Sequence, residues 1–189
     1  YDWWYAIGGS AWVVNFGAEG GYVFGYGGQP VRIVDRFYLG SPRFRGFDIR
    51  GVGPRVIRKP VLPDGTVVQD ESTWVNDSIG GQAYYLGRVE LQVPLGSKGA
   101  ELGLRPSVYV DVGGLWDAPQ QIFITPPPPG QFGYKEFYYG DSAAPRVSIG
   151  AGVSWNSPFG PFRFDLAKAL VTQQGDITKV FQFNVGTQF

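Results

Sequence analysis

The sequence predicts an all-β fold: an antiparallel up-and-down transmembrane β-barrel, of which about seven strands are present, with long external loops. Large apolar residues alternate with polar or small ones at period two through much of the chain. Several of these runs reach the roughly 9 to 11 residues that cross a bilayer at a tilt, whereas globular strands peak at about 5 to 6. The 29 glycines and 15 prolines among 189 residues disfavour a helical fold.

Four alternating segments are expected in the first two-thirds of the chain: residues 1–7, 11–26, 82–95 and 102–116. The first is short and aromatic. In 11–26 and 102–116 the large apolar residues fall mainly at even positions, and in 82–95 mainly at odd positions. The opposite positions carry charged residues, including Glu90 and Asp111. Each segment therefore has one apolar and one polar face.

Three further segments, residues 146–155, 161–167 and 181–189, complete the predicted set. Apolar residues from Val147 to Trp155 face small and polar partners, and the last segment sets Phe181 and Phe183 against Gln182 and Asn184. Apolar faces toward lipid and polar faces toward a lumen explain this pattern. The alternative is a soluble β-sandwich, which would bury the apolar face in a core.

The predicted connections differ strongly in length. Residues 94–101 and 157–161 are short, whereas residues 27–79 and 117–145 are long and read as irregular. Outer-membrane barrels combine short periplasmic turns with long external loops. An odd number of strands would leave unpaired edges in lipid, so we expect at least one strand to precede residue 1 in the native protein.

The composition argues against an enzyme. The chain contains no Cys and no His, which removes the common ligands of zinc, haem and iron–sulfur sites and most nucleophile and acid–base pairs. Sixteen basic residues balance sixteen acidic ones, so no positive field favours nucleic acid. We therefore predict no catalytic residue, no metal, no cofactor and no nucleic-acid partner.

Two lumen-facing carboxylates and one loop arginine form the candidate site. Glu90 and Asp111 on inner faces need a counter-charge unless they simply face water. Arg45, in Phe44-Arg45-Gly46-Phe47 of the first long loop, could make charge-assisted contacts that hold the loop inside the barrel. Gly46 permits a tight turn, and the two phenylalanines can wedge the arginine in place.

Several motifs together resemble the BamA family of outer-membrane protein assembly factors, also called the bacterial surface antigen family. They occur in the family's order along nearly the whole chain. They are residues 35–40 (DRFYLG), 44–47 (FRGF), 51–55 (GVGPR), 109–113 (YVDVG), 154–161 (SWNSPFGP) and 181–186 (FQFNVG). Phe44 departs from the family, which usually has Val or Ile at that position.

The resemblance implies a place in a larger protein. Residues 1–189 would be the C-terminal portion of a sixteen-stranded outer-membrane barrel domain, with the N-terminal strands and periplasmic POTRA domains absent from this sequence. Arg45 would enter the lumen to meet Glu90 and Asp111. The closing strand would form a lateral gate, with a kink at Gly186. Its gate residues would be Phe181, Phe183, Asn184, Gly186 and Phe189.

The implied function is assembly and insertion of β-barrel proteins in the outer membrane of a Gram-negative bacterium, through strand templating at the closing strand. The implied partners are unfolded outer-membrane protein clients, the BAM lipoproteins through the absent periplasmic domains, and a bilayer containing lipopolysaccharide. Alternatives are a secretion transporter of the same superfamily, of the two-partner secretion or autotransporter-assembly type, and a plain small barrel or porin. Organellar relatives share the Arg-Gly-Phe loop, so an organellar membrane also stays open.

Overall fold

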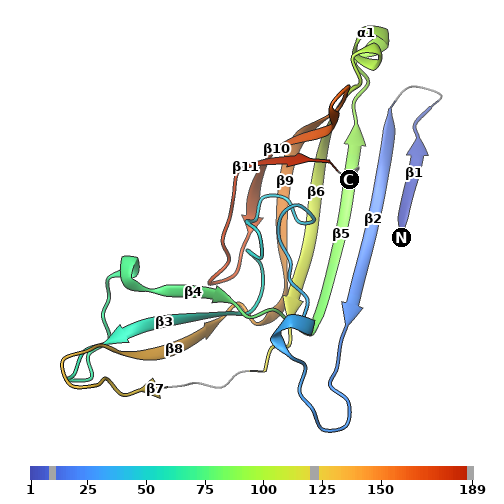
Figure 1. Cartoon of the computed structure of the whole chain (residues 1–189). Helices are drawn as coiled ribbons and strands as arrows, with labels where there is room; N and C mark the ends of the chain where they lie inside the picture. The colour runs from blue at the N-terminus through green and yellow to red at the C-terminus, as the bar shows by residue number, and fades with distance from the viewer. Residues whose placement is uncertain (9–11, 120–123, 187–189) are drawn as a thin grey trace.

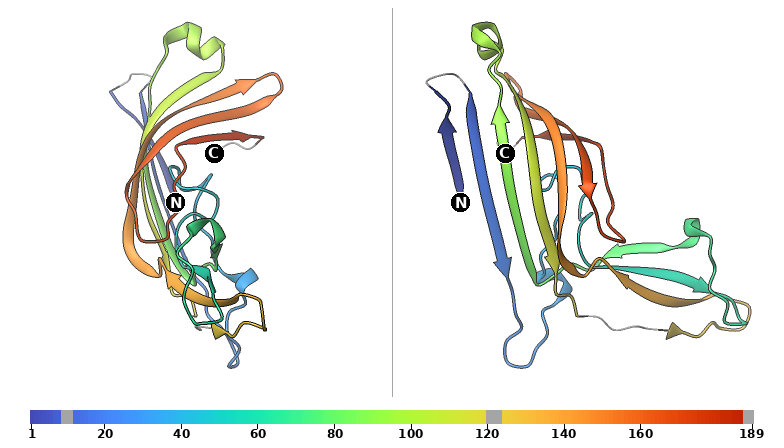
Figure 2. Two further views of the ribbon diagram at one scale, coloured as in Figure 1. Left: turned by 90° about the vertical axis from the view of Figure 1, so that its left-hand side faces the viewer. Right: turned by 180° about the vertical axis from the view of Figure 1, so that it is seen from behind.

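A seven-stranded antiparallel sheet forms the main body of the computed structural model, which describes residues 1–8, 12–119 and 124–186 (Figure 1). Neighbours in the sheet follow one another along the chain, apart from two excursions. The strands, in sheet order, are β1 (Asp2–Ala6), β2 (Val13–Tyr22), β5 (Ala83–Gln92), β6 (Leu104–Trp116), β9 (Ser142–Ser157), β10 (Gly160–Val171) and β11 (Phe181–Val185). Figure 2 shows that the sheet curves into an open trough, with β1 and β11 at its two edges.

The two ends of this trough differ. At the turn end lie the tight turn between β9 and β10 and the six-residue helix α1 (Gly96–Glu101), which occupies a connection expected to be a simple turn. No helix in the described part of the chain is long and apolar enough to cross a membrane. The long connections leave from the opposite end, the loop end, and fold on the concave side of the trough (Figure 2).

The prediction that the long connections are irregular was wrong. They contain a four-stranded antiparallel sheet, and two short 3₁₀ turns (Ile33–Asp35 and Glu71–Thr73) flank it. In sheet order its strands are β4 (Val75–Ser78), β3 (Arg55–Val61), β8 (Gly133–Tyr139) and β7 (Ile124–Thr125). Its central pairing joins β3 to β8, from Arg55 opposite Tyr139 to Val61 opposite Gly133. The sequence of β3 is rich in charges and includes a proline, so it lacks the alternation that signals a strand.

The two faces of the large sheet have opposite chemistry. On the convex face a continuous row of apolar side chains crosses four neighbouring strands, each between 37% and 48% exposed: Phe16, Val89, Val110 and Ile149. On the concave face the buried side chains are largely polar, for example Asn15, Asp111 and Ser148. This is the reverse of the soluble-sandwich alternative, in which the apolar face is buried.

The apolar core lies between the concave face and the first long connection. Residues 37–54 of that connection, here called the inner loop, fold back into the trough (Figure 1). The buried cluster joins four inner-loop residues to two strand residues: Leu39, Phe44, Phe47, Val52, Leu86 and Leu115. Phe44 and Phe47 contact each other with ring centroids 4.6 Å apart. Full burial of two such side chains stabilises the loop's position by about 3–6 kcal/mol.

Candidate functional site

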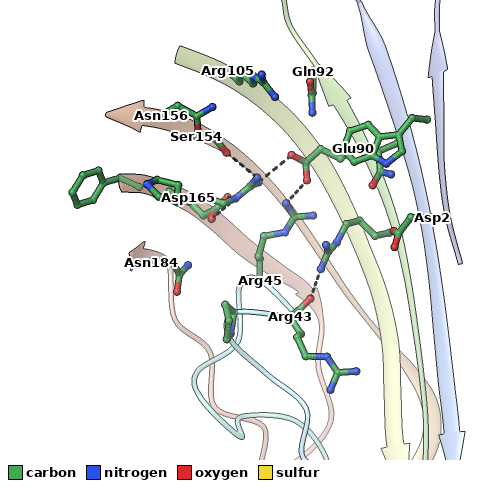
Figure 3. A pocket seen from close by; sticks show the side chains of 17 residues that line it. Asp2, Arg43, Arg45, Glu90, Gln92, Arg105, Ser154, Asn156, Asp165 and Asn184 are labelled. Carbon is green, nitrogen blue, oxygen red and sulfur yellow. Dashed lines mark hydrogen bonds and ion pairs between the residues drawn. The ribbon is translucent and has the colours of Figure 1, made fainter. Parts of the chain in front are cut away.

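The backbone of the inner loop turns sharply to place one arginine at its tip. The Phe44 amide donates to the Gly40 carbonyl over 2.9 Å, and Gly46 follows with φ +86°. Phe44 and Phe47 anchor the two sides of this turn in the apolar core. Arg45 between them points to the opposite side, into the polar lining of the trough (Figure 3).

Arg45 forms a dense set of charged hydrogen bonds in the trough. Its Nε and Nη2 donate to the two carboxylate oxygens of Asp111 over 2.8 and 2.6 Å, a bidentate pair. Its Nη1 donates to Glu90 Oε2 over 2.5 Å, as drawn in Figure 3. Arg45 is 3% exposed, and Asp111 is completely buried. The structure thus brings together the three charged residues that the sequence singled out.

Two further residues fix the arginine, and both were missed by the sequence analysis. The Arg45 guanidinium lies over the ring of Tyr109, with its Cζ 3.2 Å from the ring centroid. The Ser148 hydroxyl donates to the Arg45 carbonyl over 2.5 Å. Tyr109 and Ser148 share the inward side of their strands with Asp111 and Arg146, so strand parity was the signal that could have found them.

A second arginine balances the charge. Arg163 donates to Glu90 Oε1 over 3.1 Å and to Asp165 Oδ2 over 2.9 Å. Arg88 forms a longer ion pair with Asp111, with its Nε 3.6 Å from Oδ1. The cluster therefore pairs three arginines with three carboxylates, which offsets the cost of removing these charges from water. Arg163 and Asp165 were also absent from the predicted site, although they occupy the inward positions of β10.

The edge strand β11, in the part that the structure describes, has a short pairing with its neighbour. It pairs with the twelve-residue β10 through five residue pairs, from Phe181 opposite Leu166 to Val185 opposite Phe162. Phe181 and Phe183 are about half exposed on the convex side, and Phe183 stacks on Phe164 with centroids 4.8 Å apart.

The remaining residues of the predicted gate lie on the inner side of β11 or beyond its end. Asn184 lines a cavity of about 390 Å³ beside the arginine cluster (Figure 3). At Gly186 the backbone leaves the extended conformation with φ +91°. Phe189, which the sequence also suggested, lies outside the described residues.

The inner loop also contacts this strand directly. The side-chain amide of Gln182 in β11 donates to the Phe47 carbonyl over 3.0 Å. Just before β11, the Lys179 amide donates to the Gly46 carbonyl over 3.1 Å. The Arg45 turn is thus bonded both to the middle strands and to β11 at the sheet edge.

The chemistry available here is that of binding and positioning. In the residues that the structure describes, no group of three His, Cys, Asp or Glu side chains is placed to hold a metal ion. The carboxylates of the site are committed to arginines. What the site offers is a buried ionic anchor for a loop, next to a short strand at a sheet edge.

Comparison with known proteins identifies the family. A model of the Omp85 superfamily domain matches residues 1–189. The chain belongs to the Omp85 superfamily. This membership, together with BamA relatives from bacteria, makes it part of an integral outer-membrane protein.

Relatives within the Omp85 superfamily include outer membrane protein assembly factors BamA. That of Neorickettsia risticii is 36% identical over 177 residues, covering 94% of this chain and 20% of the relative. That of Neisseria meningitidis serogroup B is 29% identical over 186 residues, covering 92% and 21%. The sorting and assembly machinery component 50 homolog B of Xenopus laevis is 36% identical over 88 residues, covering 45% and 15%. The chain thus spans about a fifth of the length of these BamA relatives.

A solved Omp85 structure has the same fold. The crystal structure of BamA from Haemophilus ducreyi lacking POTRA domains 1–3 superimposes with a TM-score of 0.64 at 25% sequence identity. The match covers 91% of this chain and 30% of that one. The antiparallel sheet of this chain therefore corresponds to part of the BamA structure.

The contribution of the Tyr109 ring to docking of the inner loop can be tested by substitution. Tyr109→Leu removes the aromatic face beneath Arg45 and is expected to weaken inner-loop docking by about 0.5–2 kcal/mol. Tyr109→Phe keeps the ring and should behave like the wild type. The rate of chymotrypsin cleavage in the inner loop of the complete membrane-reconstituted protein measures docking. Equal protection in the Leu and Phe variants would contradict a role for the ring.

Proposed function

We propose that this chain belongs to an insertase that assembles β-barrel proteins into the outer membrane. The observation that carries the proposal is the edge strand β11, which in the described residues pairs with β10 through five residue pairs and also bonds the inner loop through Gln182. A strand edge in lipid must find hydrogen-bond partners, and an incoming client strand can supply them. Weak pairing at this edge lowers the cost of exchanging one partner for another.

The faces and strand lengths of the sheet support an orientation across the membrane. We propose that residues 1–189 form the C-terminal portion of a transmembrane up-and-down barrel, whose N-terminal strands and periplasmic POTRA domains lie outside this sequence. The exposed apolar row on the convex side suits contact with lipid, and strands such as β6, of 13 residues, and β9, of 16, are long enough to span it. The turn end would then be periplasmic and the loop end external.

The proposed partners follow from this placement. Unfolded outer-membrane proteins would approach the edge formed by β11, and the BAM lipoproteins would bind the periplasmic domains. The convex face would contact lipid and lipopolysaccharide. The named BamA relatives are assembly factors. The Arg45 cluster would serve as the ionic anchor that keeps the lumen plugged while the edge opens. The chain itself would bind and template, without a chemical reaction.

A reversible crosslink tests the gate. Asn184→Cys, paired with a cysteine in the facing first strand of the complete barrel, should form a disulfide that closes the edge. This chain has no cysteine of its own to interfere. Because a closed edge offers no backbone partners, we expect assembly of a client barrel in proteoliposomes to fall at least about tenfold when oxidised and to recover on reduction.

The matched control places the same crosslink away from the edge. Val110→Cys with Ile149→Cys joins β6 to β9, where the two residues are already directly opposite. Assembly should continue with this pair oxidised. Full activity with the Asn184 crosslink closed would overturn lateral opening. It would favour a plain barrel in which the edge has no function.

A further inference from the structure

A second buried ion pair, separate from the Arg45 cluster, lies at the loop end of the sheet. Arg146, at the start of the regular part of β9, and Asp176, in the connection between β10 and β11, are both completely buried. Arg146 Nε donates to Asp176 Oδ2 over 3.1 Å. The rest of the guanidinium donates to backbone carbonyls, including those of Ser142 over 2.6 Å and Gly140 over 2.8 Å. The arginine is thus fixed to the first residue of β9 and, through Gly140, to the connection between β8 and β9.

Asp176 joins this arginine to two other segments. It accepts a hydrogen bond from the Gln173 amide over 2.7 Å, which closes the turn of its own connection. It also accepts from the amide of Gly53 in the inner loop over 3.4 Å. One carboxylate therefore ties together the β8–β9 connection, the β10–β11 connection and the inner loop. Burial of these two charges costs desolvation free energy, and in the part of the chain that the structure describes the pair makes no hydrogen bond with the Arg45 cluster that would account for it.

The residues that follow Asp176 lead directly into the closing strand. Residues 177–179 run alongside residues 46–51 of the inner loop, and Phe47 and Thr178 face each other as an antiparallel pair. The hydrogen bonds run from the Ile177 amide to the Gly51 carbonyl (2.8 Å), from the Asp48 amide to the Ile177 carbonyl (2.9 Å) and from the Lys179 amide to the Gly46 carbonyl (3.1 Å). The inner loop therefore guides residues 177–179, and the chain meets β10 at Val180, whose carbonyl accepts from the Ala167 amide over 2.9 Å just before β11 begins.

We propose that Arg146 and Asp176 are positioning residues for the closing strand: their ion pair fastens the β10–β11 connection to the inner loop and so fixes where β11 begins. The idea rests on the proposed gate function of β11. Removing either partner leaves a buried charge without its counter-charge. Detachment of the β10–β11 connection would let water reach this charge and would remove the energetic cost of burying it. Without the fastening, the described part of β11 keeps its five pairs with β10 and the Gln182 contact with the inner loop, but its entry is no longer held, so it should open from its loop-end side.

Asp176→Asn tests this fastening in the complete protein in proteoliposomes. An asparagine keeps one acceptor oxygen but turns an amide group toward donors that previously met the carboxylate, Arg146 Nε and the Gln173 amide. Amide hydrogen exchange across residues 177–185 should become about tenfold faster or more, because local opening of that segment becomes easier. Exchange in residues 147–156 of β9 should stay unchanged.

Asp48→Asn is the matched control. Asp48 belongs to the same contact between loop and connection, but its ion pair with Lys179 is nearly half exposed, with Nζ 3.4 Å from Oδ1. The same Oδ1 also accepts a hydrogen bond from the Ile49 amide. We expect less than about a twofold change in exchange, since exposed ion pairs contribute little. Arg146→Lys keeps the charge but loses the planar fork, and should give an intermediate acceleration in a protein that still folds.

The outcomes separate this proposal from the proposed function. Equal exchange in Asp176→Asn and Asp48→Asn, or acceleration spread evenly over β9 as well, would overturn the positioning role. Selective acceleration of residues 177–185, with a fall in client assembly at constant barrel content, would support it. If the wild-type protein assembles no client, the insertase proposal fails, while the exchange data still decide whether the ion pair positions β11.

Discussion

Arg45→Ala is expected to release the inner loop from the concave side of the sheet and to cause the largest loss of the proposed assembly activity among single substitutions in this chain. The change removes the bidentate contact to Asp111 and the contact to Glu90, and leaves Asp111 completely buried with only the more distant Arg88 as counter-charge. Breaking a buried pair in this way costs about 3–5 kcal/mol. The ratio of docked to undocked loop should therefore fall by about two hundred-fold to four thousand-fold.

Arg43→Ala is the matched control for that experiment. Arg43 lies two residues away in the same loop, and its contact with Glu19 raises the pKa of its guanidinium, but this pair is close to half exposed. Its loss should cost no more than about 1 kcal/mol. Chymotrypsin is the suitable protease, because it cleaves beside Phe44 and Phe47 and its sites survive both substitutions. Equal protection of the two variants would show that the lumen charges do not hold the loop.

Period-two alternation was sufficient to predict the large sheet and its faces. Apart from the fully exposed β1, the strands of that sheet have an inward side with buried polar residues and an exposed apolar side, the reverse of a soluble sheet, and backbone geometry keeps this parity. The same parity placed Glu90 and Asp111 inward. It also applied to Arg163 and Asp165, but parity says only which residues face inward and not which of them meet, so it did not join Arg163 to Glu90.

Contacts between distant connections could not be predicted in this way. The sheet formed by β3 and β8 joins residues more than seventy positions apart, and its register depends on loops meeting in space rather than on a local pattern. Asp176 likewise lies in an irregular segment, and its structural role depends on hydrogen bonds from Arg146 and Gly53, which belong to other segments of the chain. The hydropathy pattern of a sequence does not indicate which distant loops contact one another. A charged residue in a loop becomes informative only once the partner segment is located.

Hydrogen bonds hold the inner loop at two separate places. The Arg45 cluster ties its tip to β5 and β6 in the middle of the sheet, whereas the Gly53 and Asp48 contacts tie its far side to the connection that precedes β11. A loop held at both places transmits strain between the lumen and the edge. Loosening the lumen anchor should therefore also loosen the closing strand, although the two anchors share no side chain.

Gly46→Ala is expected to undock the inner loop nearly as completely as Arg45→Ala, even though every charge stays in place. Gly46 has φ +86°, which costs an alanine about 1–2 kcal/mol. An added Cβ would also lie 2.9 Å from the Cβ of Ser148 and 3.4 Å from that of Ala167, both on the sheet behind the loop. Overpacking of this kind adds about 1–3 kcal/mol, because neither backbone can retreat without breaking strand pairing.

Gly65→Ala separates the two contributions. Gly65 has nearly the same backbone angle, φ +87°, but an added Cβ would meet nothing within 4 Å. It should therefore show the conformational cost alone, in a turn of the second sheet, with the inner loop still protected from chymotrypsin. Ser148→Gly in the Gly46→Ala background removes the nearest clashing atom and should restore part of the protection. If Gly46→Ala keeps the wild-type cleavage rate, the close approach of the loop to β9 does not control docking, and the ionic anchor alone would have to account for it.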